Sequence, residues 1–273
     1  MEKIITLDSI NKLNRYVYFD AYLLVNKSFS AFHNKSLKDA TCLRLIKKIH
    51  SLNKKAYMLL DRVLFNDEIE ELKTLILKLE EVKCDGYFVS DLGAIQMLLD
   101  LGLNDKIIYY SQTQIVSKLE YSAYKKLGIK GIFVSKDYPF ENLIECAKEN
   151  KGIGINIYGY RNLFYSRRGL LSAYQDEYAL KGRFTHSDKY LIREQKRTTK
   201  SIIYEDEHGT YVFTDYIDSH LNEIHDFDEY DINYVLIDDN FVKEELMEKV
   251  LNFIKDPSHP YIYSKEEKDT YEK

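Results

Sequence analysis

The sequence has few cysteines, no apolar segment of membrane-spanning length and no secretory signal pattern. Cys42, Cys84 and Cys146 are odd in number and far apart, which argues against a disulfide framework and fits a reducing cytoplasm. The longest apolar runs are strand-sized, far short of the ~20 residues that cross a bilayer. The first residues lead into a strand pattern without a basic segment followed by an apolar one. These absences predict a cytoplasmic protein that does not bind membranes.

Standard catalytic motifs are missing as well. The chain contains no GxGxxG, Walker, HExxH or GxSxG pattern. Among the 7 histidines, His220 and His225 are close in sequence, but their spacing does not align them on one helical face. The sequence therefore predicts no metal site, and no nucleophile–base pair can be named from it.

Charge is distributed unevenly along the chain although the net charge is only -5. Basic residues dominate residues 160–200, and acidic residues dominate residues 204–249. One interpretation is two solvated surfaces that partly neutralise each other. The other is a basic patch for an anionic ligand, next to an acidic lobe that could meet a basic partner.

Short apolar runs alternate with amphipathic helical patterns from the first residue onward. Runs without strict alternation are typical of parallel strands that are buried on both faces. Eight such runs begin near residues 3, 21, 57, 86, 106, 131, 153 and 234. This count predicts an α/β fold, a TIM-like (β/α)8 barrel forming a single domain over residues 1–255. An antiparallel β-hairpin insertion at about residues 160–230 precedes the last strand, and residues 256–273 are predicted to be a flexible C-terminal tail.

Polar residues follow most of the predicted strands. In a barrel, such residues converge on one mouth. For several of them, helix capping is the competing interpretation. The ring comprises Asp61, Arg62, Ser90, Asp91, Ser111, Gln112, Ser135, Lys136, Asp137, Tyr158, Tyr160, Arg161, Asp238 and Asp239.

The segment 158–172 is the most unusual part of the sequence, with three arginines and three tyrosines close together after a strand end. Arginine forks suit phosphate or carboxylate, and tyrosine faces suit stacking with bases. Alternatively, a helix over residues 162–174 would place the arginines on its solvated side. We predict a ligand-binding set composed of Asp91, Ser111, Gln112, Asp137, Tyr158, Arg161, Arg167 and Arg168.

The order of several motifs resembles the collagenase-like peptidase family, peptidase family U32. Asp20-Ala21-Tyr22-Leu23 is similar to the opening "GADAVYLG" segment of the family without its final glycine, and Ser90-Asp91-Leu92-Gly93 matches an "xDLG" turn. Ser111-Gln112-Thr113 and Ser135-Lys136-Asp137 lie where the family has "STQ" and "SRE". The segment ending Arg168-Gly169-Leu170-Leu171-Ser172 is similar to the signature "GRCLLS", and Glu205-Asp206-Glu207-His208-Gly209-Thr210 to an "E-D-x-x-G-T" hairpin.

The resemblance implies more than one activity. The family is named for peptidase or collagenase (hydrolase) activity, whereas other members are implicated in hydroxylating a tRNA or rRNA base or a quinone precursor. Several members bind an iron–sulfur cluster through four cysteines. Here Gly169 replaces the signature cysteine and none follows Cys146, so no cofactor is expected in this chain.

A short, cysteine-poor member looks like a partner subunit of a longer family paralogue. We therefore expect an RNA-modifying role in tRNA uridine hydroxylation, with tRNA and such a paralogue as partners. A peptidase and a non-catalytic binding partner stay open as alternatives.

Overall fold

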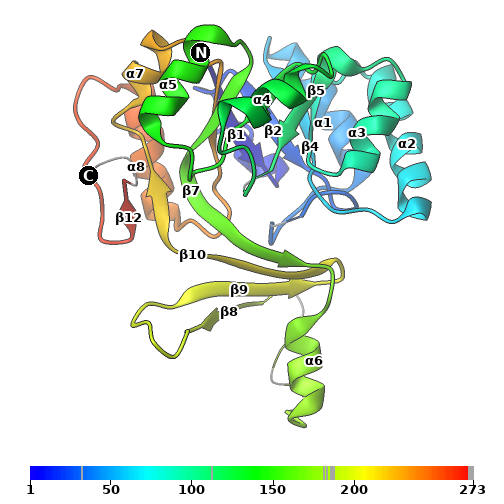
Figure 1. The fold of residues 1–273 in the computed structure, drawn as a ribbon, viewed down its shortest axis with the longest axis vertical. Helices are drawn as coiled ribbons and strands as arrows, with labels where there is room; N and C mark the ends of the chain where they lie inside the picture. Colours follow the sequence, from blue (N-terminus) through cyan, green and yellow to red (C-terminus); the bar gives the residue numbers. More distant parts are fainter. Residues whose placement is uncertain (32, 112, 181, 183, 185–187, 270–273) are drawn as a thin grey trace.

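The chain forms a closed barrel of parallel strands with a smaller lobe beneath it (Figure 1). The computed structural model describes residues 1–31, 33–111, 113–180, 182, 184 and 188–269. Within these residues, eight parallel strands pair in the order β11-β1-β2-β3-β4-β5-β6-β7, and β11 also pairs with β7 to close the ring. These strands are β1 (Glu2–Leu7), β2 (Ala21–Val25), β3 (Lys55–Leu60), β4 (Gly86–Val89), β5 (Ile107–Tyr110), β6 (Gly131–Phe133), β7 (Ile153–Ser166) and β11 (Tyr234–Ile237). The predicted TIM-like (β/α)8 barrel is confirmed.

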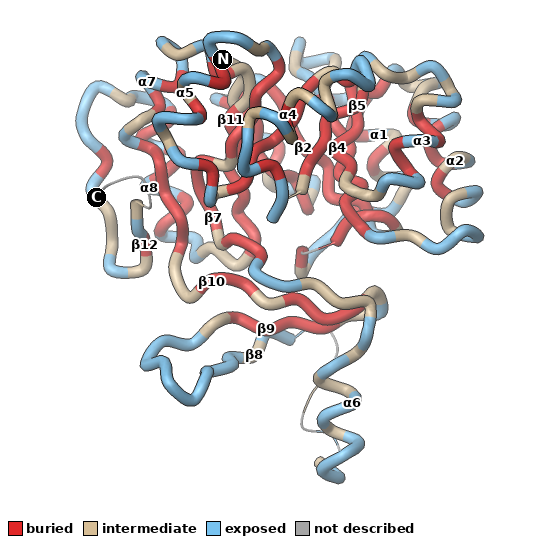
Figure 2. The backbone as a smooth tube through the Cα atoms, viewed as in Figure 1, coloured by how far each residue is buried: buried red, intermediate tan, exposed pale blue. Residues whose placement is uncertain are grey.

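Helices cover the outside of the barrel, and their apolar sides pack on the strands. Figure 2 shows the buried strands surrounded by helices whose outer sides are exposed. In α8, for example, Val250 and Ile254 are buried, as expected for residues one helical turn apart on the same face. The helices around the barrel are α1 (Asp39–Ser51), α2 (Asn66–Glu81), α3 (Leu92–Asp100), α4 (Lys118–Lys125), α5 (Phe140–Glu149), α7 (Ile224–Glu229) and α8 (Glu244–Lys255). Among the residues described, no helix is long and apolar enough to cross a membrane.

Aromatic side chains fill the barrel interior. The Phe88 ring lies 5.5 Å from Tyr57, 5.6 Å from Tyr110 and 5.1 Å from Phe133 between ring centroids, and all four side chains are buried. Tilted ring pairs of this kind contribute about 0.5–1.5 kcal/mol each beyond area burial. The interior is therefore a packed core, and open space begins only above it, at the carboxyl ends of the strands.

The lobe arises because β7 continues beyond the barrel. Its outer half pairs with β10 (Gly209–Ser219), which pairs with β9 (Ser201–Asp206), and β9 pairs with β8 (Lys189–Ile192), all antiparallel. The short helix α6 (Leu170–Glu177) projects from this sheet (Figure 1). The predicted antiparallel insertion before the last strand is thus confirmed. It lies across the carboxyl ends of the barrel strands.

Two glycines permit the course of the lobe. Gly159 has φ of +134° where β7 leaves β11, and a Cβ there would lie 2.6 Å from the main-chain oxygen of Asp238. Gly209 has φ of +141° at the start of β10, where a Cβ would lie 2.1 Å from the main-chain oxygen of Ser166. Residues with a side chain rarely adopt such positive φ values, so both positions require glycine.

Local structure after residue 160 differs from the helix over residues 162–174 that was considered as an alternative from the sequence. Residues up to Ser166 are strand, and α6 begins only at Leu170. Further along the chain, β10 extends to Ser219 and α7 begins at Ile224. Cross-strand pairing with β10, which joins residues far apart in sequence, accounts for the difference: the rings of Tyr165 and Tyr211 stack at 4.9 Å.

Residues 256–269, which belong to the segment predicted to be a flexible tail, pack back against the barrel, and their flexibility stays a prediction. Strand β12 (Glu267–Lys268) pairs with β10. Glu267 is buried, and its Oε1 accepts hydrogen bonds from the hydroxyls of Tyr158 (2.8 Å) and Tyr261 (2.7 Å). A buried carboxylate needs such partners, and the two tyrosines supply them. Residues 270–273 of the predicted tail lie outside the described residues.

Candidate active site at the barrel mouth

A cavity of about 470 Å³ opens at the carboxyl ends of β3, β4 and β5, and the extended part of β7 forms its other wall. Its volume lies within the range typical of small-molecule sites, roughly 300–1,000 Å³. Among the described residues that line it, Asp61 is the sole carboxylate and there is no lysine or arginine. The lining residues are Asp61, Val63, Ser90, Tyr109, Tyr110, Ser111, Thr113, Gln114, Asn162, Leu163, Phe164 and Tyr165.

Asp61 is a buried carboxyl on the cavity wall whose pKa is displaced toward neutral pH. It directly follows β3 and is 2% exposed. Its Oδ1 accepts a hydrogen bond from the main-chain N–H of Ala31 at 2.8 Å, whereas its buried Oδ2 has no hydrogen-bond partner among the described residues. Burial raises the pKa of this carboxyl to about 7, against the opposing effect of His33. Near neutral pH, Asp61 can therefore either donate or accept a proton in the cavity.

His33 and Asp238 form a buried pair behind Asp61. The His33 Nε2 lies 3.3 Å from Asp238 Oδ1, and its Nδ1 lies 2.9 Å from the main-chain oxygen of Ala31. Burial alone would lower the pKa of His33, but the Asp238 carboxylate outweighs it and the pKa rises to about 9. Thr6 donates a further hydrogen bond to Asp238 at 3.3 Å. At neutral pH His33 is an imidazolium that compensates a buried carboxylate.

Arg161 lies at the centre of a second buried network. Its Nε donates to Asp218 Oδ2 at 3.0 Å, and one terminal nitrogen donates to the main-chain oxygen of Asn156 at 2.7 Å. Although burial opposes ionisation, the Arg161 guanidinium holds the pKa of Asp218 below its ordinary value. The Asn156 amide donates to the Tyr110 hydroxyl at 3.3 Å, which links this network to the cavity wall.

The other two arginines of the predicted set lie at the rim. Arg167 forms an ion pair with Glu68 at 2.6 Å, and its guanidinium lies 4.0 Å from the centroid of the Phe65 ring. Arg168 is exposed at the base of α6. Arg161 pairs with Asp218. Arg167 shares Glu68 with Arg62, whose terminal nitrogen lies 2.6 Å from Glu68 Oε1, so one carboxylate faces two guanidinium groups at this part of the rim.

Asp91 is brought to the same part of the rim as Arg167. Its side chain caps α3 by accepting from Ala94 N at 2.9 Å, and it accepts from Leu64 N at 3.3 Å. Arg167 donates to the neighbouring Val63 main-chain oxygen at 2.7 Å. Both side chains therefore fasten the loop that follows Asp61.

The remaining predicted residues are spread around the mouth. Ser111 lines the cavity, whereas Gln112 lies outside the described residues. Asp137 is exposed and pairs with Lys136 at 2.8 Å. Tyr158 is buried and donates its hydroxyl to Glu267, away from the cavity lining. The role of the set in ligand binding stays a prediction.

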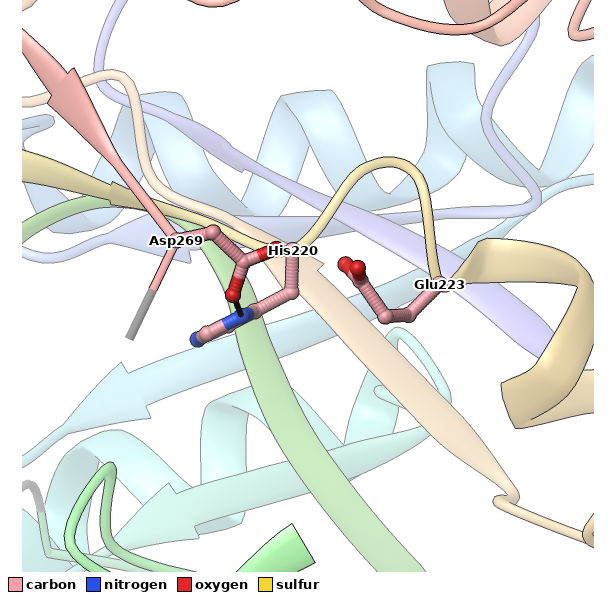
Figure 3. Close-up of side chains that lie close together, drawn as sticks. All are labelled: His220, Glu223 and Asp269. Atoms are coloured by element: carbon pink, nitrogen blue, oxygen red, sulfur yellow. Dashed lines mark hydrogen bonds and ion pairs between the residues drawn. The ribbon is translucent and has the colours of Figure 1, made fainter. Parts of the chain in front are cut away.

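A third polar cluster joins the lobe to the C-terminal segment (Figure 3). His220, Glu223 and Asp269 offer ligand atoms within 4.8 Å of one another. However, His220 Nδ1 lies 3.1 Å from Asp269 Oδ1 and its Nε2 lies 3.3 Å from Asp218 Oδ1. Burial would lower the pKa of His220, but these carboxylates raise it. Both ring nitrogens of His220 thus face carboxylates, which suits a structural clasp better than a metal ligand.

The cysteines do not lie at the mouth. Cys42 is in α1, Cys84 precedes β4 and Cys146 is in α5, and all three are buried in the layer between strands and helices. Burial raises the pKa of both Cys42 and Cys84 to about 12. The three cysteines thus belong to separate elements, and the absence of a bound cluster in this chain stays a prediction.

Sequence reasoning missed part of the site. Asp61 follows a predicted strand, a signal that did place it in the polar ring, but its burial was not visible. His33 lies in the long β2–α1 connection and Asn156 lies within β7, where no motif marks them. Only the closure of the barrel brings them together.

Comparisons with known proteins agree with one another. The model of the family described as peptidase family U32 matches residues 14–273. Two proteins named tRNA hydroxylation protein P, from Helicobacter pylori strains 26695 and J99, are 27% and 22% identical over 128 residues. This stretch is 46% of the chain but only 30% of each relative. The solved structure of the U32 peptidase Mk0906 aligns with a TM-score of 0.56 at 11% identity, covering 87% of this chain and 92% of that one.

Proposed function

The chain belongs to peptidase family U32, and on this premise we propose that it acts in tRNA uridine hydroxylation, with the mouth cavity holding the base. The relatives named tRNA hydroxylation protein P support this choice of branch. Their similarity covers less than a third of their own length, so the remainder of their activity need not lie in this chain. We place its action in the cytoplasm.

The single observation that carries the proposal is Asp61 in the cavity. Because Asp61 Oδ1 already accepts from Ala31 N–H, a protonated Oδ2 can donate one hydrogen bond to a carbonyl oxygen of uracil. Its pKa of about 7 keeps this form populated at neutral pH, and its Oδ2 has no partner among the described residues. Tyr110 and Tyr165 add aromatic surface on the cavity wall, which suits a planar ring.

The ligand preferred by this geometry is a neutral ring rather than an anion held by arginines. Arg161 already pairs with Asp218, and Arg167 is held by Glu68, which also pairs with Arg62. Phosphates of the RNA would instead meet exposed basic side chains outside the cavity, such as Arg168. We therefore propose that the anionic ligand expected at the mouth is a nucleotide. Its base would enter the mouth cavity, and its phosphate would stay outside the cavity.

We further propose that the chain works with a longer paralogue. Its three cysteines are buried in separate elements, fewer than the four thiolates that hold a cluster, so the partner would carry any redox cofactor of the reaction. In this arrangement the chain contributes the base-binding cavity as a subunit.

The test is the tRNA nucleoside content of a strain that lacks the gene. Hydroxylated uridine should fall on deletion and return with the wild-type gene. Asp61→Ala should not restore it, because the variant removes the only carboxylate among the described lining residues. Asp100→Ala, which truncates an exposed carboxylate at the end of α3, is the matched control and should restore it. An unchanged hydroxyuridine pool in the deletion strain would contradict the proposal.

The peptidase alternative rests on the family description alone. Peptide hydrolysis needs an activated nucleophile or metal-bound water. In the cavity, the Ser90 hydroxyl donates to the main-chain oxygen of Asp61 at 3.0 Å, which is not an activating base. Cleavage of gelatin or casein by the purified protein, lost in Asp61→Ala, would favour the peptidase instead.

A further inference from the structure

A second concave surface lies on the outer face of the lobe. It has a volume of about 810 Å³ and lies between α6 and the sheet of β7, β10, β9 and β8. Figure 1 shows α6 projecting away from the barrel at one end of the lobe, with the β8–β9 connection at the other end. We call it the lobe groove, and it is lined by Phe164, Leu170, Leu171, Tyr174, Phe184, Tyr190, Leu191, Ile192, Arg193, Ile203, Thr210 and Val212.

A row of aromatic rings runs along the lobe groove. The Tyr174 ring lies 4.7 Å from Tyr178 and 6.2 Å from Phe184, and Phe184 lies 5.0 Å from Tyr190 between centroids. Tyr174 is 50% exposed and Tyr178 is 62% exposed. Exposed rings on successive positions offer faces on which bases can stack.

Basic side chains lie on β8 and the β8–β9 connection, and Arg193 lines the lobe groove, whereas the exposed carboxylates of Asp176 and Glu177 lie on α6. Residues 189–200 contain five basic side chains and one acidic one, Glu194. Arg193, Lys196, Arg197 and Lys200 are all exposed. Glu194 offsets only Arg197, by an ion pair at 2.9 Å. A local excess of positive charge on long, exposed side chains attracts a polyanion.

We propose that the lobe groove binds a single-stranded segment of RNA, with bases on the aromatic row and phosphates at the basic fringe. Charge favours RNA over a protein partner, because an apolar protein surface gains little from four exposed cations. Phe164 is common to the linings of the lobe groove and the mouth cavity, so the two sites lie next to each other. The identity of the RNA as tRNA rests on the proposed function, whereas RNA binding by the lobe groove does not.

The experiment is a binding titration of the full chain with a fluorescent 12-nucleotide oligoadenylate, which has no uracil to enter the mouth. Tyr174→Ala combined with Tyr178→Ala should weaken binding by roughly fivefold to 150-fold for each base that loses its stacking partner. Tyr18→Ala removes a tyrosine that is 43% exposed on the barrel and should leave the affinity unchanged. Thermal unfolding of each variant checks that the fold is intact.

A charge variant tests the phosphate contacts separately. Arg193→Ala combined with Lys196→Ala should lower the slope of log affinity against log salt by about 1.4 in magnitude, or about 0.7 per lost phosphate contact. Lys47→Ala combined with Lys48→Ala, two exposed lysines of α1, should not change it.

Oligoadenylate affinity that is unchanged in both groove variants would overturn the inference, as would equal losses in the controls. A wild-type protein that binds no single-stranded RNA, together with a co-purifying protein that is lost in the groove variants, would also overturn the inference. Because oligoadenylate contains no uridine, groove binding can succeed when the hydroxyuridine pool does not change. Conversely, the pool can depend on the gene while the groove variants bind normally, so the two failures are distinguishable.

Discussion

Replacing Asp61 by asparagine should stabilise the protein at alkaline pH. Asp61 is 2% exposed, and only its Oδ1 has a hydrogen-bond partner among the described residues, the main-chain N–H of Ala31. Asparagine has the same shape and keeps an oxygen for that hydrogen bond, but it carries no charge at any pH. The substitution therefore removes the cost of ionising a buried carboxyl while leaving the packing unchanged.

The magnitude follows from the pKa. Burial raises the Asp61 pKa from 3.8 to about 7, a difference of about 3, and each unit corresponds to about 1.36 kcal/mol. A raised carboxyl pKa means that the folded state holds the proton more tightly than the unfolded state. The wild type therefore loses stability as pH rises from about 4 to about 7, and the loss is complete above that range. Relative to wild type, Asp61→Asn should gain on the order of 4 kcal/mol at pH 8 and almost nothing near pH 4.

The assay is urea unfolding of wild type and variant at several pH values between 4 and 8.5. Asp100→Asn, at an exposed position of α3, is the control and should show a difference that varies little with pH. A free-energy difference for Asp61→Asn that does not change with pH would refute the reasoning. Destabilisation at every pH would refute it too, because it would mean that the ionised carboxylate is favoured in the fold.

Three further substitutions have defined outcomes. His33→Gln should destabilise by about 3 kcal/mol at pH 6, since the His33 pKa is raised to about 9; its contribution is complete below pH 6.5 and is lost as pH rises through 9, so urea unfolding at pH 10 should show little difference. Gly159→Ala should lower the thermal midpoint, because positive φ costs roughly 1–3 kcal/mol and the new Cβ would lie 2.6 Å from Asp238 O. Glu267→Ala should accelerate tryptic cleavage of the C-terminal segment, because Tyr158 and Tyr261 each lose an acceptor at about 1–3 kcal/mol; an unchanged cleavage rate would show that β12 is held by other contacts.

The barrel could be predicted from sequence because its pattern is local. Each strand is a short apolar run, and each helix, such as α8, shows its apolar side by residue spacing. The course of the chain after Gly159 could not, because one strand changes partners there, from β11 to β10, and the pairing involves residues far apart in sequence. The C-terminal segment was hidden for a similar reason: Glu267 looks like a solvated charge until Tyr158 and Tyr261 surround it.

The candidate site divides in the same way. Position after a strand was enough to place Asp61 and Ser111 at the mouth, since all strand ends converge in a barrel. The electrostatics of the site could not be predicted from the sequence, because they depend on which charged side chains contact one another in the fold. Arg161 faces Asp218, and Arg167 faces Glu68, across sequence separations that no motif links. The three arginines of residues 158–172 suggested anion binding, whereas two of them form ion pairs within the chain.

Photo-crosslinking of tRNA that contains 4-thiouridine tests the base-binding cavity most directly. After irradiation of the purified protein with this tRNA, proteolysis and mass spectrometry locate the crosslinked peptides. We predict crosslinks in the segments that contain Tyr110 and Tyr165, with lower yield in Asp61→Ala than in Asp100→Ala. Crosslinks confined to the outer helices, or equal yields in the two variants, would contradict a uridine site at the barrel mouth.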